Sequence, residues 1–203
     1  MRTRFASVRG FSLAEVTLTL MVTSALSAVV SPVISDYVSD ARHVQVTSDM
    51  NTLAVTFTRF SYDARMAAPA DRHWQRVDVL VGEGLAPVVA PGIDAAWNGE
   101  TGGGKVGRLE DHLQSNAAGY ETASAGPATF AGARGWRGPY LTPGIKADPW
   151  GHRYVINVGS WSQRRGALVV LSAGPNGIIE TPFNTPGVTP GGDDLIVIVA
   201  PVK

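Results

Sequence analysis

The hydrophobic and polar positions of this chain separate a long apolar run near the N-terminus from a patterned remainder. From Phe11 to Ile34 the only ionisable side chain is Glu15. A helix of about 24 residues, at about 1.5 Å each, is long enough to cross a hydrocarbon core of about 30 Å. The run predicts a membrane-spanning helix over residues 11–35.

The apolar pattern then changes to that of a half-buried helix. Apolar residues recur at spacings of four, three, four and three, at Val46, Met50, Leu53, Phe57 and Phe60. This spacing places them along one face of a helix. We expect the helix to continue over residues 36–66 and to pack on a small globular domain, ending between Tyr62 and Met66, before Pro69.

The middle of the chain, residues 67–135, has a weak pattern and is expected to be loop-rich and variable. It predicts a short strand over residues 77–81, a short amphipathic helix over residues 106–114 and a turn at Gly102-Gly103-Gly104. Lys105 follows these glycines without the Ser or Thr of a phosphate-binding loop, so we do not expect one.

Regular pattern returns in residues 136–203. Asp148-Pro149-Trp150-Gly151 has the residue types of a tight turn and leads into an alternating strand over residues 153–158. Further strands are expected over residues 167–172 and 195–199. A long helix followed by a small C-terminal antiparallel sheet predicts an α+β fold.

Charge and composition narrow the classes of function. The chain has 17 basic and 17 acidic residues, no cysteine, and no basic stripe of the kind that binds nucleic acid. Its four histidines have no metal-binding spacing, and no Gly-x-Ser-x-Gly motif occurs. We therefore expect neither an enzyme nor a nucleic-acid-binding protein, with an anchored periplasmic hydrolase as the alternative from another class.

The basic residues around the apolar run predict its orientation. Arg2, Arg4 and Arg9 precede the run, and the next arginine is Arg42. The positive-inside bias then places the leader in the cytoplasm and the C-terminal domain in the periplasm of a single-pass membrane protein.

The stretch Gly10-Phe11-Ser12-Leu13-Ala14-Glu15 resembles the N-terminus of type IV pilins and pseudopilins. The resemblance implies that prepilin peptidase removes residues 1–10 as a leader peptide and methylates the new terminal Phe11. Removing the three leader arginines leaves 14 basic and 17 acidic residues, a net charge of −3. Pro32 also falls where pilin helices usually carry a kinking proline.

Glu15 is not needed by a plain membrane anchor. An acid inside a membrane helix costs on the order of a few kcal/mol unless it is paired. The resemblance implies that the Glu15 carboxylate faces the α-amino group of Phe11 in a neighbouring subunit of an assembled filament. The alternative is a tolerated polar residue near the membrane edge.

Two C-terminal motifs narrow the resemblance. Gly138-Pro139-Tyr140-Leu141 followed by Asp148-Pro149-Trp150-Gly151 is similar to the major pseudopilin of type II secretion systems. The implied protein is a pilin-like subunit of a bacterial inner-membrane filament, whose partners are further copies, other pseudopilins, prepilin peptidase and the assembly platform. A type IV pilus subunit is the alternative, although many pilins have a C-terminal cysteine pair that this chain lacks.

The segment from Leu171 to Asp194 carries the remaining chemistry. Between Gly166 and Val202 there are three acids, Glu180, Asp193 and Asp194, and no lysine or arginine. A long loop with uncompensated carboxylates and many backbone carbonyls suits a hard cation such as calcium.

The resemblance implies calcium at this loop. The implied ligands are the side chains of Asn176, Asp193 and Asp194, with help from Leu171 and Ser172. Asn176 stands where the family usually has aspartate, which should weaken binding. The alternative is a solvated acidic turn, or an Asp193 that caps backbone amides.

An ordinary secretory signal peptide is a competing interpretation of the N-terminus. Ala25-Leu26-Ser27 offers a small-residue cleavage site after a basic start and an apolar core. Cleavage there would release a periplasmic protein that begins at Ala28. Against this, Glu15 lies near the start of the apolar region, where a charge is disfavoured.

Overall fold

The computed structural model describes residues 10–64, 69–70, 76–98, 105–122, 135–141, 145–159, 161, 167–183 and 188–199. The chain forms two compact units, Met1–His43 and Val44–Lys203. The expected leader up to Arg9 and the turn at Gly102-Gly103-Gly104 lie outside the described residues.

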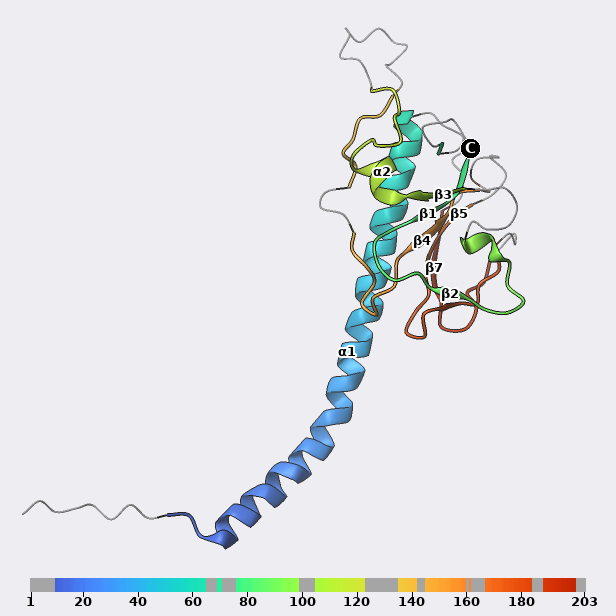
Figure 1. Cartoon of the computed structure of the whole chain (residues 1–203). Coiled ribbons are helices and arrows are strands. Elements are labelled where there is room, and N and C mark those ends of the chain that lie inside the picture. The colour runs from blue at the N-terminus through green and yellow to red at the C-terminus, as the bar shows by residue number, and fades with distance from the viewer. Residues whose placement is uncertain are drawn as a thin grey trace, which may run out of the picture. The chain divides into compact units, whose positions relative to one another are not determined.

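Helix α1 (Leu13–Ala64) begins in the first unit and ends in the second (Figure 1). Its N-terminal portion is long and apolar enough to cross a membrane, and none of that window is buried within the chain. A helix of the predicted length and apolar composition is therefore present, and it includes Pro32 without interruption. Helix α1 ends within the predicted range.

Several polar side chains in the apolar half of α1 form hydrogen bonds within the helix. Five hydroxyls donate to carbonyl oxygens three or four residues earlier, at 2.8 to 3.1 Å: Thr17, Thr19, Thr23, Ser24 and Ser35. Because water is absent from a hydrocarbon core, polar groups there need such internal partners. These residues are compatible with a membrane-spanning segment.

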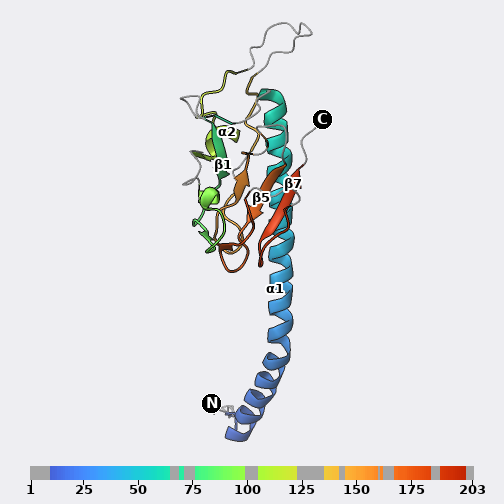
Figure 2. The same ribbon diagram turned by 90° about the vertical axis from the view of Figure 1, so that its right-hand side faces the viewer.

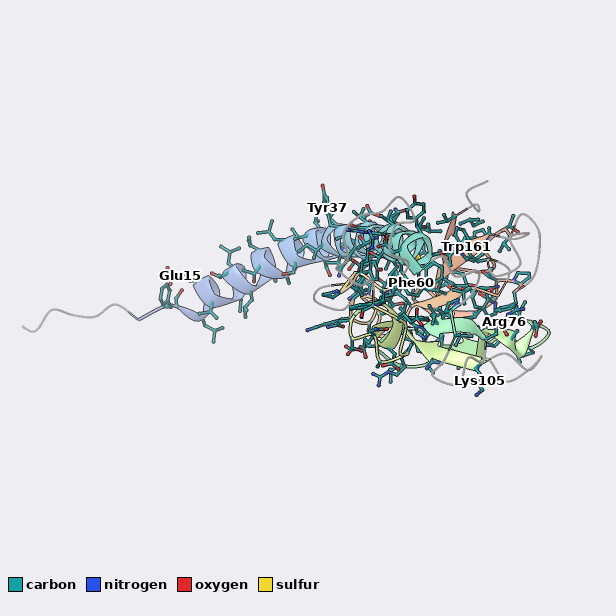
Figure 3. The ribbon with its side chains drawn as sticks, turned by 90° about the horizontal axis from the view of Figure 1, so that it is seen from above. Glu15, Tyr37, Phe60, Arg76, Lys105 and Trp161 are labelled. Atoms are coloured by element: carbon teal, nitrogen blue, oxygen red, sulfur yellow. The ribbon has the colours of Figure 1, made fainter. Side chains whose placement is uncertain are left out.

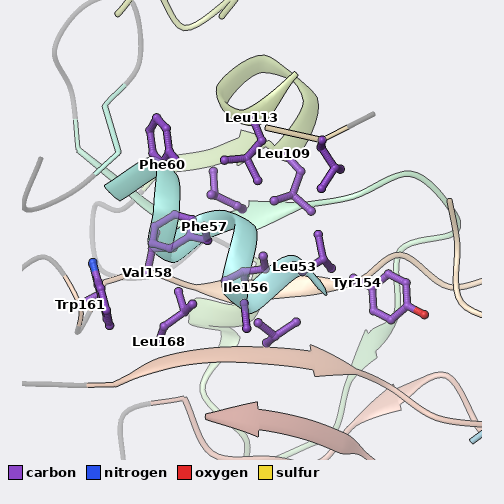
Figure 4. Packing of buried hydrophobic residues seen from close by; sticks show 14 of the residues in the cluster. Leu53, Phe57, Phe60, Leu109, Leu113, Tyr154, Ile156, Val158, Trp161 and Leu168 are labelled. Carbon is purple, nitrogen blue, oxygen red and sulfur yellow. The ribbon is translucent and has the colours of Figure 1, made fainter. Parts of the chain in front are cut away.

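In the second unit, residues 44–64 of α1 bury one face of the helix. The five residues of the predicted apolar stripe are all buried there: Val46, Met50, Leu53, Phe57 and Phe60. Leu53 and Phe57 point toward Ile156 of the sheet (Figure 4). The phenyl rings of Phe57 and Phe60 lie 5.8 Å apart. This stripe joins the helix to the globular part of the unit.

The main sheet has five strands in the order β3-β1-β4-β5-β7. Their bounds are Val77–Val81 for β1, Lys105–Arg108 for β3, Val155–Asn157 for β4, Leu168–Ser172 for β5 and Leu195–Val199 for β7. The three C-terminal strands pair antiparallel, as predicted. Strand β1 pairs antiparallel with β4 and parallel with β3, so the sheet is mixed.

Strand β3 corrects one sequence prediction. Residues 106–114 were expected to form a single short helix, but only Leu109–Leu113 do so, as α2. Arg108, which precedes this helix, has an extended backbone with φ −88° and ψ 133°. Pairing of β3 with Val77 to Val81 provides backbone partners that a helix pattern cannot reveal, because they come from a distant segment.

The sheet buries both faces. On one face, Tyr154, Ile156 and Leu168 pack with the buried stripe of α1, and Figure 2 shows the sheet beside this part of the helix. On the other face, Val155, Val169 and Leu171 join a second cluster. Alternation along β4 and β5 follows from the two-residue period of a strand.

The second cluster is covered by short elements from the middle and the C-terminal segments. They are the 3-10 helix η1 (Ala95–Asn98) and the parallel pair β2 (Val88–Val89) and β6 (Ile178–Ile179). Part of the expected variable region therefore contributes to the core rather than projecting from it.

Candidate functional site

Gly10 lies immediately before the helix, and nothing in its surroundings requires a glycine. A Cβ atom added to Gly10 would meet no described heavy atom within 4 Å, and its φ is outside the left-handed region. Folding of the described residues therefore places no steric demand on this position. A requirement for glycine here would have to come from a molecule that binds the segment.

Ser12 and Glu15 form a reciprocal capping box at the start of α1. The Ser12 N–H donates to Glu15 Oε2 at 2.8 Å, and the Glu15 N–H donates to Ser12 Oγ at 3.2 Å. Two backbone donors that lack partners at a helix N-terminus are thereby satisfied. Figure 3 shows Glu15 at this end of the helix. The Ser-x-x-Glu spacing could have predicted the cap from sequence.

Asp194 lies inside the C-terminal loop and is only 5% exposed. Its Oδ2 accepts hydrogen bonds from Glu180 N at 2.8 Å, Thr181 N at 2.7 Å and Thr181 Oγ1 at 2.6 Å. Burial raises the pKa of the Asp194 carboxyl, and the charge of Asp193 adds to this, whereas the hydrogen bonds from Thr181 and Glu180 lower it. Asp194 is thus a buried acid whose charged form is incompletely compensated.

Asp193 and Asn176 form hydrogen bonds with backbone amides of the turn that follows β5. Asp193 Oδ2 accepts a hydrogen bond from Asn176 N at 3.1 Å. The side-chain oxygen of Asn176 accepts from Ile178 N at 2.6 Å, and its amide nitrogen lies 3.4 Å from Glu180 Oε2. Asp193 therefore caps a backbone amide, one of the alternatives raised by the sequence, while keeping its second oxygen for another partner.

The other two residues expected to help bind calcium, Leu171 and Ser172, make other contacts. Leu171 lies within β5, where its backbone faces neighbouring strands. The Ser172 hydroxyl donates to Asp148 Oδ2 at 2.7 Å and accepts from Gly174 N at 3.3 Å. These two residues belong to the support of the loop in this structure.

Two carboxylate oxygens of the C-terminal loop are buried without a partner. Asp193 Oδ1 and Asp194 Oδ1 are buried and have no hydrogen-bond partner. Among the described residues, no three His, Cys, Asp or Glu side chains are grouped to hold a metal. Calcium takes six to eight oxygen ligands, so two carboxylates would need backbone carbonyls, amide oxygens or water in addition.

Trp97, in the middle segment, contacts the C-terminal loop. Trp97 Nε1 donates to the carbonyl oxygen of Thr181 at 2.7 Å, and the Trp97 ring meets Phe183 edge-on at 5.0 Å. Trp97 is almost fully buried. Residues from η1 thus hold the segment whose backbone amides bind Asp194, a contact that sequence pattern did not indicate.

His112 is the histidine most deeply placed among the described residues. It is 2% exposed, and its Nδ1 shares a hydrogen bond with the Tyr120 hydroxyl. Trp136 Nε1 donates to the His112 carbonyl oxygen at 2.9 Å. Burial raises the pKa of Tyr120. These contacts tie α2 to the following segment and account for His112 as a core residue.

Comparison with known proteins gives no match to a protein-family model, a curated protein or a solved structure.

Proposed function

We propose that this chain is the structural subunit of a helical filament, cleaved after Gly10 and assembled from the membrane through α1. The observation that carries the proposal is the exposed, apolar stretch of the first unit from Phe11 to Ile34, which contains one acid, Glu15, five residues after that glycine. A membrane anchor alone explains the apolar surface. It does not explain the Gly10-Phe11 pair, nor why the capping residue is a charged glutamate when glutamine could also form the cap.

Packing of identical helices against one another would bury this exposed apolar surface between subunits. Leu18, Leu20, Met21 and Leu26 are each more than half exposed in the single chain. Copies related by a rotation and a translation that do not close on themselves form an open fibre. A filament core built from residues 11–34 would therefore bury the same residues in every subunit.

Glu15 can act both as a cap and as an intersubunit partner. Its Oε2 accepts a hydrogen bond from the Ser12 N–H, and the Glu15 side chain is exposed in the single chain. Cleavage after Gly10 would create a charged amino group on Phe11. An Oε1 contact with this group of a neighbouring copy would offset the cost of an acid in an apolar bundle, a cost that is on the order of a few kcal/mol when it is unpaired.

The N-terminus of the mature protein tests the proposal directly. Mass spectrometry of protein purified from its own membrane should give an N-terminal methylated Phe11, and electron microscopy should show fibres that contain it. An N-terminus at Ala28 would instead establish cleavage by signal peptidase, and the filament proposal would be abandoned.

Within this class, we favour a type II secretion pseudopilus over a surface pilus. The support is the order of the Gly-Pro-Tyr-Leu and Asp-Pro-Trp-Gly motifs and the absence of cysteine. Deleting the gene and measuring both secreted proteins and surface fibres separates the two. Loss of secretion with no surface fibres in the parent strain supports a pseudopilus, whereas loss of surface fibres with normal secretion supports a type IV pilus.

We also propose that the C-terminal loop binds calcium. The unpartnered, buried Oδ1 atoms of Asp193 and Asp194 and the absence of lysine and arginine from the segment support it. Calcium would supply the positive charge that this segment lacks. Titration calorimetry of the metal-free protein with calcium chloride should show binding, and a flat titration would remove calcium from the proposal without affecting the filament function.

A further inference from the structure

Asp148 connects the Asp-Pro-Trp-Gly turn to the C-terminal loop. It is 3% exposed, and its Oδ1 accepts hydrogen bonds from Trp150 N at 3.0 Å and His152 N at 2.8 Å. The bond from Trp150 N is the one expected of an aspartate that begins a turn, and the bond from His152 N extends it to the residue after the turn. They occupy one oxygen only, and the second oxygen serves a different part of the chain.

That second oxygen reaches the end of β5. Asp148 Oδ2 accepts a hydrogen bond from Ser172 Oγ at 2.7 Å, and the same hydroxyl accepts from Gly174 N at 3.3 Å. Ser172 is fully buried. The carboxylate thus sets the direction of the hydroxyl proton, which leaves the lone pairs of Ser172 Oγ directed toward the following turn.

Gly174 carries the connection to Asp193. Its φ is +62°, and an added Cβ would lie 2.3 Å from the Asp193 carbonyl oxygen. The turn therefore fits closely against the backbone of Asp193, and only glycine fits at that point. Asn176 N, two residues further on, donates to Asp193 Oδ2. Direct contacts run from Asp148 through Ser172 and Gly174 to the acid of the loop.

We infer that Asp148 is a positioning residue for the Asp193 carboxylate, acting through Ser172 on the turn at residues 174–177. The inference rests on the proposed calcium site for its functional meaning. It reassigns Ser172 from metal ligand to bridge, because the contacts of its hydroxyl are with Asp148 and Gly174.

Ser172→Ala separates this role from the support of the turn. The substitution removes the bridge and leaves both hydrogen bonds of Asp148 Oδ1 in place. Asp148→Asn is the second variant, since its amide oxygen can still accept from the turn while its amide nitrogen cannot accept from Ser172. Ser61→Ala is the matched control, because Ser61 Oγ accepts from Trp161 Nε1 at 3.0 Å elsewhere in the core.

The measurement is amide hydrogen exchange of the full-length protein in detergent, first without metal and then with calcium chloride. We expect Ser172→Ala and Asp148→Asn to raise exchange at residues 173–180 by about tenfold or more over Ser61→Ala, with β1 changed no more than in that control. Calcium affinity, measured by calorimetry, should fall by a similar factor in both variants.

Exchange at residues 173–180 that matches the Ser61→Ala control in both variants would overturn the inference, as would unchanged calcium affinity in variants of a protein that binds calcium. If the wild-type protein binds no calcium, the calcium proposal fails separately. The metal-free exchange pattern then still decides whether Asp148 holds the loop.

Discussion

The hydroxyl of Tyr154 donates a hydrogen bond to Oδ2 of Asp49 at 3.1 Å, and this bond joins β4 to α1. Tyr154 is fully buried. Burial raises the pKa of Tyr154, and the negative charge of Asp49 raises it further. The bond therefore links the position of the helix to the protonation of a phenol.

Alkaline pH should weaken the second unit through Tyr154. The pKa of a tyrosine in the unfolded chain is about 10. Because the pKa of Tyr154 is raised in the folded protein, its contribution to the free energy of unfolding is fully present below that pH and is lost as the pH rises above it. Urea unfolding between about pH 8 and about pH 11 should show a fall in the free energy of unfolding. Tyr154→Phe should reduce the slope with which the free energy of unfolding falls as the pH rises. An unchanged slope would show that Tyr154 is not responsible, and Tyr120→Phe measures the share of the other buried tyrosine.

The buried stripe of α1 should dominate the stability of the second unit. Phe57 is 1% exposed, whereas Val55, two residues earlier, is 70% exposed. Phe57→Ala should lower the free energy of unfolding by about 3 to 5 kcal/mol, because it leaves a cavity. Val55→Ala is the control and should change it by less than about 0.5 kcal/mol. Equal losses in urea denaturation would contradict the packing.

Glu15→Gln should separate the charge of Glu15 from its cap. Glutamine can replace glutamate in a capping box, so the start of α1 should be retained. The charge that would pair with a neighbouring amino group is lost. We expect normal processing and membrane insertion but no fibres by electron microscopy. Ser12→Ala, which keeps the charge and removes the hydroxyl, is the matched control, and normal fibres from Glu15→Gln would argue against charge pairing.

Gly10→Leu should block cleavage without affecting the fold. The described residues leave open space around Gly10, so a side chain there meets no steric barrier. Intact-mass measurement should show the leader retained, while circular dichroism of the purified protein should match the unprocessed wild type. Efficient cleavage of the variant would mean that glycine is not what the peptidase recognises.

Removal of calcium should destabilise the protein through Asp193. A ligand at about a hundred times its dissociation constant adds about 2.7 kcal/mol, which corresponds to a melting temperature higher by about 5 to 10 °C in a domain of this size. Chelator should therefore lower the melting temperature of the full-length protein in detergent. Asp193→Ala should be insensitive to chelator, and Glu121→Ala, an exposed acid elsewhere, should respond like the wild type.

Much of the fold was predictable where the pattern depends on neighbours along the chain. The apolar run, the stripe from Val46 to Phe60 and the strands at residues 195–199 all follow from periods of 3.6 or 2 residues. The capping box of Ser12 and Glu15 is equally local and was recognisable by its spacing. In contrast, residues 106–108 of β3 were expected to be helical, because a local pattern does not reveal that their partner strand, β1, lies about 28 residues earlier.

The sequence by itself determined an apolar helix with one acid, an α+β class and an acidic C-terminal loop without basic residues. Only the tertiary structure decided that Asp194 turns inward to bind Thr181, that Ser172 bridges to Asp148, and that the sheet is mixed. Periodicity reports which side of an element is apolar, and it can be counted along the chain. The partner of a buried polar atom depends on which distant segments the folded core brings within about 3 Å of it.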